Sequence, residues 1–268
     1  MTTLSKVSAS LILGKWTQRL LEAILLGGQL VPHLLKGKIH LRNTIDQMVV
    51  AGPESLLITL VTALFVGMVF TIQVARELIN FGAGSAVGGV LAVALIRELA
   101  PVLSGVVLAG RVGSAFAAEI GTMRVTEQID ALYMLRTDPV DYLVIPRVIA
   151  CCLMLPILTI MFLLTGLAGG VLIGTYLYHL SSDTFLDSVR NFIQVWDINK
   201  AMFKALCFGA LIAIIGCNWG LTTTGGAKGV GQSTTSSVVT ALLLIFITNF
   251  FLSWVLFQGT ENTFFQGV

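Results

Sequence analysis

Five long apolar stretches dominate the sequence and restrict its fold more than any other feature. A helix needs roughly 20 apolar residues to cross the ~30 Å hydrocarbon core of a bilayer, and each stretch meets or exceeds that length. They lie at about Glu54–Ile79, Ala86–Ala118, Val148–Leu180, Ala201–Leu221 and Val238–Phe257. Because 56% of the residues are hydrophobic and only 11% are charged, the sequence predicts an all-α integral membrane protein.

The second and third stretches are longer than a bilayer requires. At about 33 residues each, they would be ~50 Å long as continuous helices, so we expect them to bend, tilt or project beyond the membrane. Pro101 and Pro156 give each stretch a reason to bend, because proline removes a helical hydrogen bond. The first stretch has a clear start at Gly52-Pro53-Glu54, since proline at the first helical position loses no hydrogen bond.

The residues before the first span favour a helix that lies along the membrane surface. Apolar residues recur there at helical spacing, and polar residues occupy the opposite side. The apolar set is Leu13, Trp16, Leu20, Ile24 and Leu25, and the polar set is Lys15, Gln18, Arg19 and Glu22. A sixth transmembrane helix across Leu20–Leu35 is the alternative, which Gly27, Gly28 and Pro32 weaken. A short helix near Arg42–Val50 is expected to lead into the first span.

The distribution of Lys and Arg among the connections predicts the orientation in the membrane. The N-terminal segment is rich in both, and the connection between the second and third spans carries Arg124, Arg136 and the flanking Arg147. Both regions are therefore expected to face the cytoplasm. The connection at Ser181–Asn199 is rich in aspartate and is expected outside. Five spans then place the N-terminus in the cytoplasm and the C-terminus outside.

Small residues recur at every fourth position in the second and third spans. They are Gly105, Ala109, Gly113, Ala117 and Gly121, a parallel row of Gly110, Ser114 and Ala118, and in the third span Gly166, Gly170 and Gly174. Such rows let helix backbones approach closely in lipid, where the hydrophobic effect does not drive helices together. Packing within one chain and a seam between two copies explain the rows equally well.

Three charged residues inside the second span predict a polar patch. A charge deep in a membrane helix costs a few kcal/mol, so Arg97, Glu98 and Arg111 each need a partner or a function. Arg97 and Arg111 fall near one helix face, and Glu98 points to one side. Pro101 also frees the carbonyl of Arg97 from its helical hydrogen bond. Together these groups indicate a polar patch lining a cavity, and a purely structural ion pair is the alternative.

The sequence carries no enzyme signature. It has three histidines, with no HExxH zinc pair and no Ser–His–Asp arrangement, and its four cysteines lack metal-ligand spacing and are expected in the core. The glycine-rich stretch Thr222–Thr234 lacks the order of a phosphate-binding loop, so we expect a flexible cytoplasmic turn. Any ATP must then be bound by another chain. The small net charge of +2 gives no sign of a nucleic-acid partner.

A concentrated group of charges at Glu119–Tyr142, EIGTMRVTEQIDALYMLRTDPVDY, separates the second and third spans. Apolar and acidic residues occupy opposite sides there, which predicts a short amphipathic helix. The two sides are Val125, Ile129 and Leu132, and Glu127 and Asp130. Asp138 as N-cap and Pro139 at the first position then begin the next helix. A charged helix in this place suits a membrane subunit that receives force from a soluble motor.

The residues from Arg97 to Arg147 resemble a known family. The run RELAPVLSGVVLAGRVGSAFAAEIGTMRVTEQIDALYMLRTDPVDYLVIPR is similar to the MlaE/YrbE permeases of ABC systems that move lipids with MCE-domain partners. REL-P, AGR-GSA-AAE-GTMRVTEQIDAL and DP--YLV-PR occur in order at the family's spacing, and the flanks match in length and span pattern. The resemblance implies one permease domain over residues 1–268, with an interfacial helical region at 1–52 and a transmembrane region at 53–268.

The resemblance implies a permease subunit of an ATP-binding-cassette lipid transporter rather than an enzyme. The subunit would form a homodimer that binds two cytoplasmic ATPase chains, which would hold the ATP and magnesium, and MCE-domain proteins on the outer side. This chain itself would carry no cofactor and no metal. A glycerophospholipid or related lipid would occupy a cavity at the dimer interface. The membrane would be a bacterial inner membrane, or a plastid inner envelope, since ALYMLRTDPVDYLV is closer to the cyanobacterial and plastid branch.

The resemblance also implies roles for residues. The segment matching Arg124–Leu135 is the coupling helix that contacts the ATPase, and the segment with Arg97 and Glu98 lies near the lipid cavity, where Arg111 is a third candidate. The coupling residues are Arg124, Glu127, Gln128, Asp130 and Leu132. Tyr133, Arg136 and Asp141 depart from the pattern of many members, which leaves the surface offered to the ATPase open.

Two other functions stay open at this point. An ion-coupled secondary transporter would use Arg97, Glu98 and Glu119 as relay groups, although the chain shows no inverted repeat and an odd number of spans. A membrane scaffold that only anchors partner proteins is the other alternative.

Overall fold

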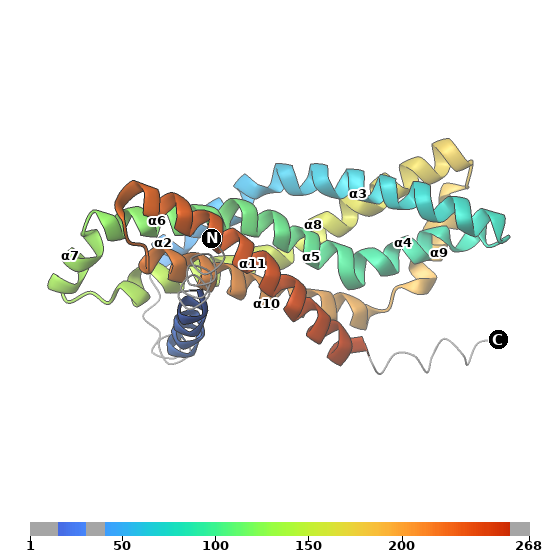
Figure 1. Cartoon of the computed structure of the whole chain (residues 1–268). Coiled ribbons are helices and arrows are strands. Elements are labelled where there is room, and N and C mark those ends of the chain that lie inside the picture. The colour runs from blue at the N-terminus through green and yellow to red at the C-terminus, as the bar shows by residue number, and fades with distance from the viewer. Residues whose placement is uncertain (1–15, 31–40, 258–268) are drawn as a thin grey trace, which may run out of the picture. The chain divides into compact units, whose positions relative to one another are not determined.

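The computed structural model describes residues 16–30 and 41–257, and the regular elements of these residues are all helical. Residues 16–30 form one helix, which is followed by α2 (Leu41–Ala51) and α3 (Pro53–Asn80). The next run holds η1 (Gly84–Ala86), α4 (Val87–Ala94), η2 (Leu95–Leu99), α5 (Ala100–Leu108), η3 (Ala109–Gly113) and α6 (Ser114–Val125). The remaining elements are α7 (Gln128–Met134), η4 (Val140–Val144), α8 (Ile145–Tyr178), α9 (Ser182–Phe192), α10 (Val195–Leu221) and α11 (Gly226–Phe257) (Figure 1).

Five helical segments of the described chain are long and apolar enough to cross a membrane. They are Leu41–Asn80, Gly84–Val125, Val140–Tyr178, Val195–Leu221 and Gly226–Phe257. Each overlaps one of the five apolar stretches, so the predicted all-α membrane class and the number of spans are confirmed. The helix of residues 16–30 is not one of these five. Leu13, Lys15 and the end of the alternative span Leu20–Leu35 lie outside the described residues.

The chain divides into two compact units. The first unit consists of the described part of Met1–Gln47 together with Ala109–Ala150 and Ala210–Leu242. The second unit consists of Met48–Leu108, Cys151–Gly209 and the described part of Leu243–Val268. Each unit therefore combines three segments that are distant in the sequence. That residues 1–268 act as a single permease domain stays a prediction.

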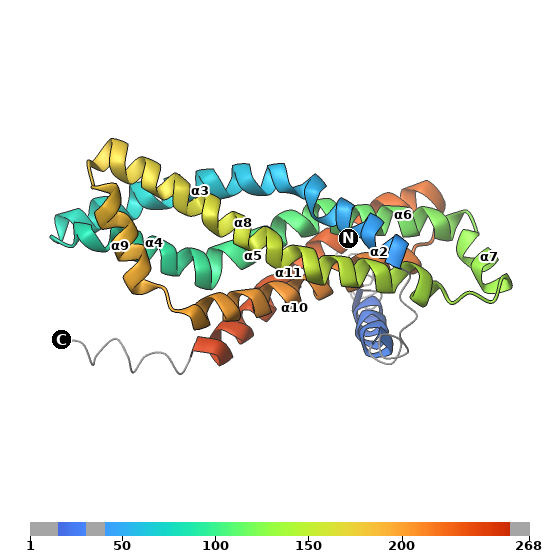
Figure 2. The same cartoon turned by 180° about the vertical axis from the view of Figure 1, so that it is seen from behind.

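The second unit has a continuous apolar core. It is built from buried side chains of α3, α4, η2, α5, α8 and α9, with Leu91, Leu95, Phe162 and Phe185 among the largest. The helix α9 lies beside α4 in both views (Figures 1 and 2). There the backbone N–H of Gly89 donates to the Ser188 hydroxyl at 3.0 Å. This short helix thereby covers the end of the α4 span.

The predicted helix starts are confirmed at two places. Pro53 occupies the start of α3, directly after Gly52, and Glu54 lies in the first turn. Ahead of η4, the N–H of Val140 donates to the Asp138 carboxylate at 2.9 Å. A side-chain oxygen thus satisfies a backbone donor that a helix start would otherwise leave unpaired.

The long second span departs from a regular α-helix at two π-helical turns, Leu95–Leu99 and Ala109–Gly113. Pro101 follows the first of them and has no N–H to donate to the carbonyl of Arg97. The backbone there forms the longer hydrogen bond of a π-helix instead, in which the N–H of Ala100 donates to the carbonyl of Leu95. Such π turns are frequent at functional sites. At Pro101, where the sequence predicts a bend, the span contains a wider turn, and the bend itself stays a prediction.

The prediction of a flexible turn across Thr222–Thr234 is wrong for most of that stretch. Only residues 222–225 lie outside a helix, and α11 begins at Gly226. Polar side chains of this kind are compatible with a membrane helix when their hydroxyls donate to backbone carbonyls of the preceding turn. The Thr234 hydroxyl, for example, donates to the carbonyl of Val230 at 2.8 Å. The turn itself is made by Gly225 and Gly226, which have positive φ angles of 91° and 68°.

The small-residue rows lie against helices of their own unit. In the first unit, a Cβ added to Gly113 would lie 3.2 Å from Ile212, and Ala109 and Ala117 are fully buried. In the second unit, added Cβ atoms at Gly105, Gly166, Gly170 and Gly174 would contact Phe208, Leu95, Leu91 and Phe185 respectively. By contrast, Gly110 of the parallel row has nothing within 4 Å of an added Cβ.

The approach of α3 to α8 generates a test of this packing. A Cβ added to Gly67 would collide with the backbone carbonyl of Gly166, and backbone cannot move aside cheaply. We expect Gly67→Ala to destabilise the protein by about 1–3 kcal/mol, measured as a lower Tm of the full chain in detergent. Gly28→Ala is the matched control, because an added Cβ there meets nothing within 4 Å and alanine favours the helix. Equal Tm values for the two variants would contradict the close contact.

Candidate functional site

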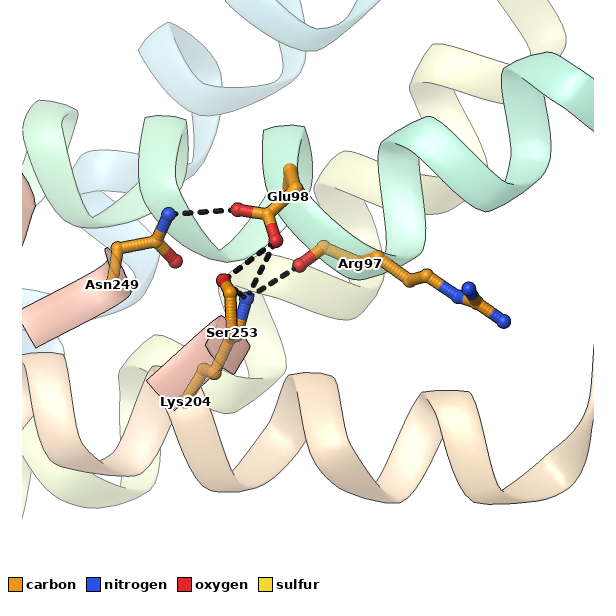
Figure 3. Close-up of polar contacts among 5 residues, drawn as sticks. All are labelled: Arg97, Glu98, Lys204, Asn249 and Ser253. Carbon is orange, nitrogen blue, oxygen red and sulfur yellow. Dashed lines mark hydrogen bonds and ion pairs between the residues drawn. The ribbon is translucent and has the colours of Figure 1, made fainter. Parts of the chain in front are cut away.

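Glu98 lies at the centre of a polar cluster inside the second unit. This Glu98 cluster consists of Glu98 in η2, Lys204 in α10, and Asn249 and Ser253 in α11 (Figure 3). The Lys204 ammonium lies 3.0 Å from Glu98 Oε1, and the Ser253 hydroxyl donates to the same oxygen at 2.7 Å. The Asn249 amide donates to Glu98 Oε2 at 2.7 Å. Two helices thus supply partners for both carboxylate oxygens.

The Lys204 ammonium is fully buried and fully paired. Besides Glu98, it donates to the carbonyl of Arg97 at 2.8 Å and to the Ser253 hydroxyl at 2.7 Å. An ammonium has three N–H donors, so all of them have acceptors. The carbonyl of Arg97 is the one that Pro101 leaves without its helical partner. A buried cation on α10 therefore satisfies the backbone group that the proline exposes.

The Arg97 side chain belongs to a second ion pair. Figure 3 shows its guanidinium pointing away from Glu98, and it contacts the buried carboxylate of Asp197 at 3.1 Å. The guanidinium also lies 5.1 Å from the centre of the Phe257 ring, which Lys200 approaches at 4.8 Å. Arg97 and Glu98 are therefore not paired with each other. Each has an opposite charge on α10.

The Glu98 cluster is buried on one side and open on the other. The Lys204 side chain has 0% of its surface exposed, whereas the Glu98 side chain is 43% exposed. Hydrocarbon does not solvate a carboxylate, so the open side of Glu98 requires water, a polar lipid group or another polypeptide. The cluster is thus both a structural junction and an accessible polar surface within an apolar span.

Sequence reasoning found Arg97 and Glu98 and missed their partners. Lys204 and Asn249 interrupt apolar stretches in the same way as Arg97 and Glu98, so the same signal applied to them. Asp197 was assigned to an outside connection, but α10 begins at Val195 and buries it. Ser253 carries no such signal, because a lone serine is common in membrane helices.

The remaining predicted lipid-binding residue, Arg111, lies in η3 of the first unit and is half-buried. Arg97 and Glu98 belong to the second unit. The Glu98 cluster as defined above is built without Arg111. The three candidates therefore do not form one group within either unit.

The charged connection between the second and third spans contains the short helix α7. The predicted helix began at Val125, which is wrong, because Val125 ends α6 and α7 begins at Gln128. Glu127 separates the two helices with a positive φ of 60°, which interrupts helical hydrogen bonding. In α7, Ile129 is buried and Leu132 is half-buried, whereas Gln128 is exposed. The exposed carboxylate of Asp130 pairs with Arg124 at 2.7 Å.

A second buried cation ties together the helices that flank α7. Arg147 at the start of α8 contacts Glu119 of α6 at 2.9 Å and donates to the carbonyl of Leu143 at 2.9 Å. Its guanidinium also lies 5.3 Å from the centre of the Phe116 ring. Sequence reasoning had used Arg147 only for the orientation. The pair holds α6 and α8 together at the base of the α7 connection.

The four cysteines are free, with Cys151 and Cys217 buried and Cys152 and Cys207 half-buried. Within residues 16–30 and 41–257, no three His, Cys, Asp or Glu side chains form a group that could hold a metal ion.

The ion pair between Lys204 and Glu98 generates a stability prediction. Lys204→Met removes the cation that contacts Glu98 and the carbonyl of Arg97. We therefore expect the free energy of unfolding to fall by about 3 kcal/mol. This value is at the lower end for breaking a buried ion pair, because Glu98 is partly exposed. Adding Glu98→Gln to this variant should restore part of the loss, since an amide needs no cation. A double-mutant cycle of unfolding in detergent measures the coupling. The exposed Arg76 of α3 supplies the control Arg76→Met, and additive losses would contradict the pairing.

Comparisons with known proteins show the family of the chain. The family model described as Permease MlaE matches residues 44–255. A probable ABC transporter permease protein of Synechocystis sp. is 66% identical over 94% of this chain and 95% of its own length. The protein TRIGALACTOSYLDIACYLGLYCEROL 1, chloroplastic, of Arabidopsis thaliana is 51% identical over 93% of this chain and 71% of its own length. A probable ABC transporter permease protein of Rickettsia prowazekii is 40% identical over 85% of this chain and 88% of its own length. The chain belongs to the MlaE permease family of ABC transporters.

Proposed function

We propose that the chain is the membrane subunit of an ATP-driven transporter that moves lipids, glycerophospholipids or related lipids, between membranes. The observation that carries the proposal is the partly exposed carboxylate of Glu98, held by a buried cation inside an apolar span. Family membership supports the transporter class. The name of the Arabidopsis relative contains that of a galactolipid, trigalactosyldiacylglycerol, which supports a lipid as the cargo.

In this proposal, Arg97 and Glu98 of the second unit contact the polar headgroup of the transported lipid, and Arg111 of the first unit is a separate candidate for contact with lipid. The open side of Glu98 accepts hydrogen bonds from headgroup donors, and the Arg97 guanidinium offers donors to a phosphate or a sugar hydroxyl. Lys204, Asn249 and Ser253 hold the carboxylate in place from behind. Because these partners lie on α10 and α11, a shift of either helix changes how Glu98 is presented to the lipid.

The proposed assembly is a homodimer with two cytoplasmic ATPase chains, which hold the ATP and magnesium, and an MCE-domain protein on the outer side. The N-terminus faces the cytoplasm of a bacterium, or the membrane is the inner envelope of a plastid. The α7 connection receives the motion of the ATPase through Arg124, Glu127, Gln128, Asp130 and Leu132. The Arg147–Glu119 pair supports this role, because it makes α6 and α8 move together when α7 is displaced.

The role of Glu98 is tested by measuring lipid transfer by the full complex reconstituted into vesicles. We expect Glu98→Arg to abolish ATP-dependent lipid transfer between vesicles, because it places a cation beside Lys204 and removes the acceptor. Glu98→Gln keeps a side-chain oxygen that can accept from Lys204 and Ser253 but removes the negative charge. We expect this variant to be less stable yet still assemble, and to slow transfer about tenfold or more. The control Glu77→Gln alters an exposed acid of α3.

If both Glu98 variants still transport lipid, the role of Arg97 and Glu98 is purely structural. Transport that survives removal of ATP and collapses with the proton gradient would instead indicate an ion-coupled transporter.

The coupling role of α7 is tested by co-purification. Reversing Glu127 and Asp130 to Lys should detach the ATPase without lowering the Tm of the permease, because both side chains are exposed. Asp130 also pairs with Arg124, so the swapped variant Arg124→Asp with Asp130→Arg preserves that ion pair in reverse. We expect the swap to lose the ATPase as well. An ATPase that stays bound to the double-lysine variant would show that α7 is not its docking helix.

A further inference from the structure

The first unit contains a large cavity, lined by charged and polar residues and by two tryptophans, that the proposed transport site does not include. Its volume is about 1050 Å³, and it lies among the helix of residues 16–30, the end of α10 and the start of α11. The charged side chains in its lining are Arg19, Glu22 and Lys228. Hydroxyl, amide and indole groups supply most of the remaining lining, including Thr222, Gln232 and Trp16. The lining thus combines charged and hydrogen-bonding groups with the apolar rings of Trp16 and Trp219, which suits an amphipathic ligand.

The walls of the cavity are held by hydrogen bonds between the three helices. The Arg19 guanidinium donates to the carbonyl of Thr222 at 3.1 Å, and the Asn218 amide donates to the carbonyl of Arg19 at 2.8 Å. The Trp16 indole donates to the Thr240 hydroxyl at 3.1 Å. Because only one of its N–H groups is used in that bond, Arg19 is positioned and keeps donors for a ligand.

The start of α11 adds positive potential to the cavity. Lys228 lies in its first turn, where no acidic side chain is present. Lys228 is exposed, and it has no hydrogen bond or ion pair with any residue that the structure describes. The unpaired N–H groups of a first turn carry partial positive charge. An exposed ammonium and a fixed guanidinium therefore line one cavity together with one carboxylate, that of Glu22, and such paired cations bind phosphate groups.

An apolar strip borders this cavity on the same helix. Leu21, Ile24 and Leu25 are 60%, 69% and 66% exposed, whereas Ala23 and Leu26 are buried. On a helix, Leu21 lies one turn from Gln18, and Leu25 one turn from Glu22, and both of these polar residues line the cavity. In a membrane permease such a strip faces acyl chains. A polar head site and an apolar strip thus share one helix.

We propose that this cavity binds the phosphate-bearing headgroup of a membrane lipid, with the phosphate at Lys228 and Arg19 and the acyl chains along Leu21, Ile24 and Leu25. We treat this lipid as a resident of the site rather than the transported cargo, because no residue of the Glu98 cluster lines the cavity. The inference goes beyond the proposed transport function and does not depend on it.

The test is a titration of the purified full chain with dioctanoyl-phosphatidylglycerol, followed by native mass spectrometry. We expect Lys228→Gln to lower the affinity of one bound lipid about tenfold, the effect of one charge-assisted hydrogen bond. The control Arg42→Gln removes the same charge from an exposed position of α2 and should bind like the unaltered chain. Dioctanoylglycerol, which lacks the phosphate, should show no binding that depends on Lys228.

Two further arms separate the sources of phosphate and the two lipid sites. Inorganic phosphate should compete only at concentrations far above those of the lipid, because it makes no contact with the apolar strip. Phosphate that competes as well as the lipid would overturn the proposal in favour of a free anion, and unaltered lipid affinity in Lys228→Gln would overturn it outright. Binding that depends on Lys228 should persist in Glu98→Gln, whether or not that variant transports.

Discussion

The buried ammonium of Lys204 joins three membrane helices of the second unit at one point. It bonds to Glu98 and the carbonyl of Arg97 on η2 and to Ser253 on α11, while its own side chain belongs to α10. A charge in an apolar span is costly unless every donor finds an acceptor. This requirement sets where η2, α10 and α11 meet. It also sets the position of Glu98, whose open side is the accessible polar surface of that span.

The same need to satisfy polar groups explains features that look like defects in the sequence. Pro101 removes a backbone donor. A π turn precedes it, and Lys204 of α10 donates to the carbonyl of Arg97 that the proline leaves unpaired. In the serine- and threonine-rich first half of α11, the hydroxyls of Thr234 and Thr240 bond to carbonyls one turn back, so these polar groups are satisfied within the helix itself. In the first unit, Arg147 and Glu119 perform for α6 and α8 what Lys204 and Glu98 perform in the second.

The sequence predicts well whatever depends on neighbours along the chain. The five spans, the start of α3 at Pro53 and the cap of Asp138 follow from length, composition and local hydrogen bonding, and all three are present. The sequence-based predictions are wrong where the side-chain pattern indicates one structure and the backbone conformation adopts another. The helix expected from Val125 is split by the left-handed conformation of Glu127, and the glycines of Thr222–Thr234 suggested a turn in a stretch that is mostly helix.

The sequence by itself determined that the chain is a multi-span helical membrane protein with charges in its second span, because hydropathy and helix periodicity are properties of consecutive residues. Only the tertiary structure decided which charges pair. Arg97 and Glu98 are adjacent in sequence, yet they pair with Asp197 and Lys204, which lie 100 and 106 positions further along the chain. The cavity between residues 16–30 and α11 has the same origin. Side chains from distant segments meet there, and no local pattern encodes which distant segments pack together.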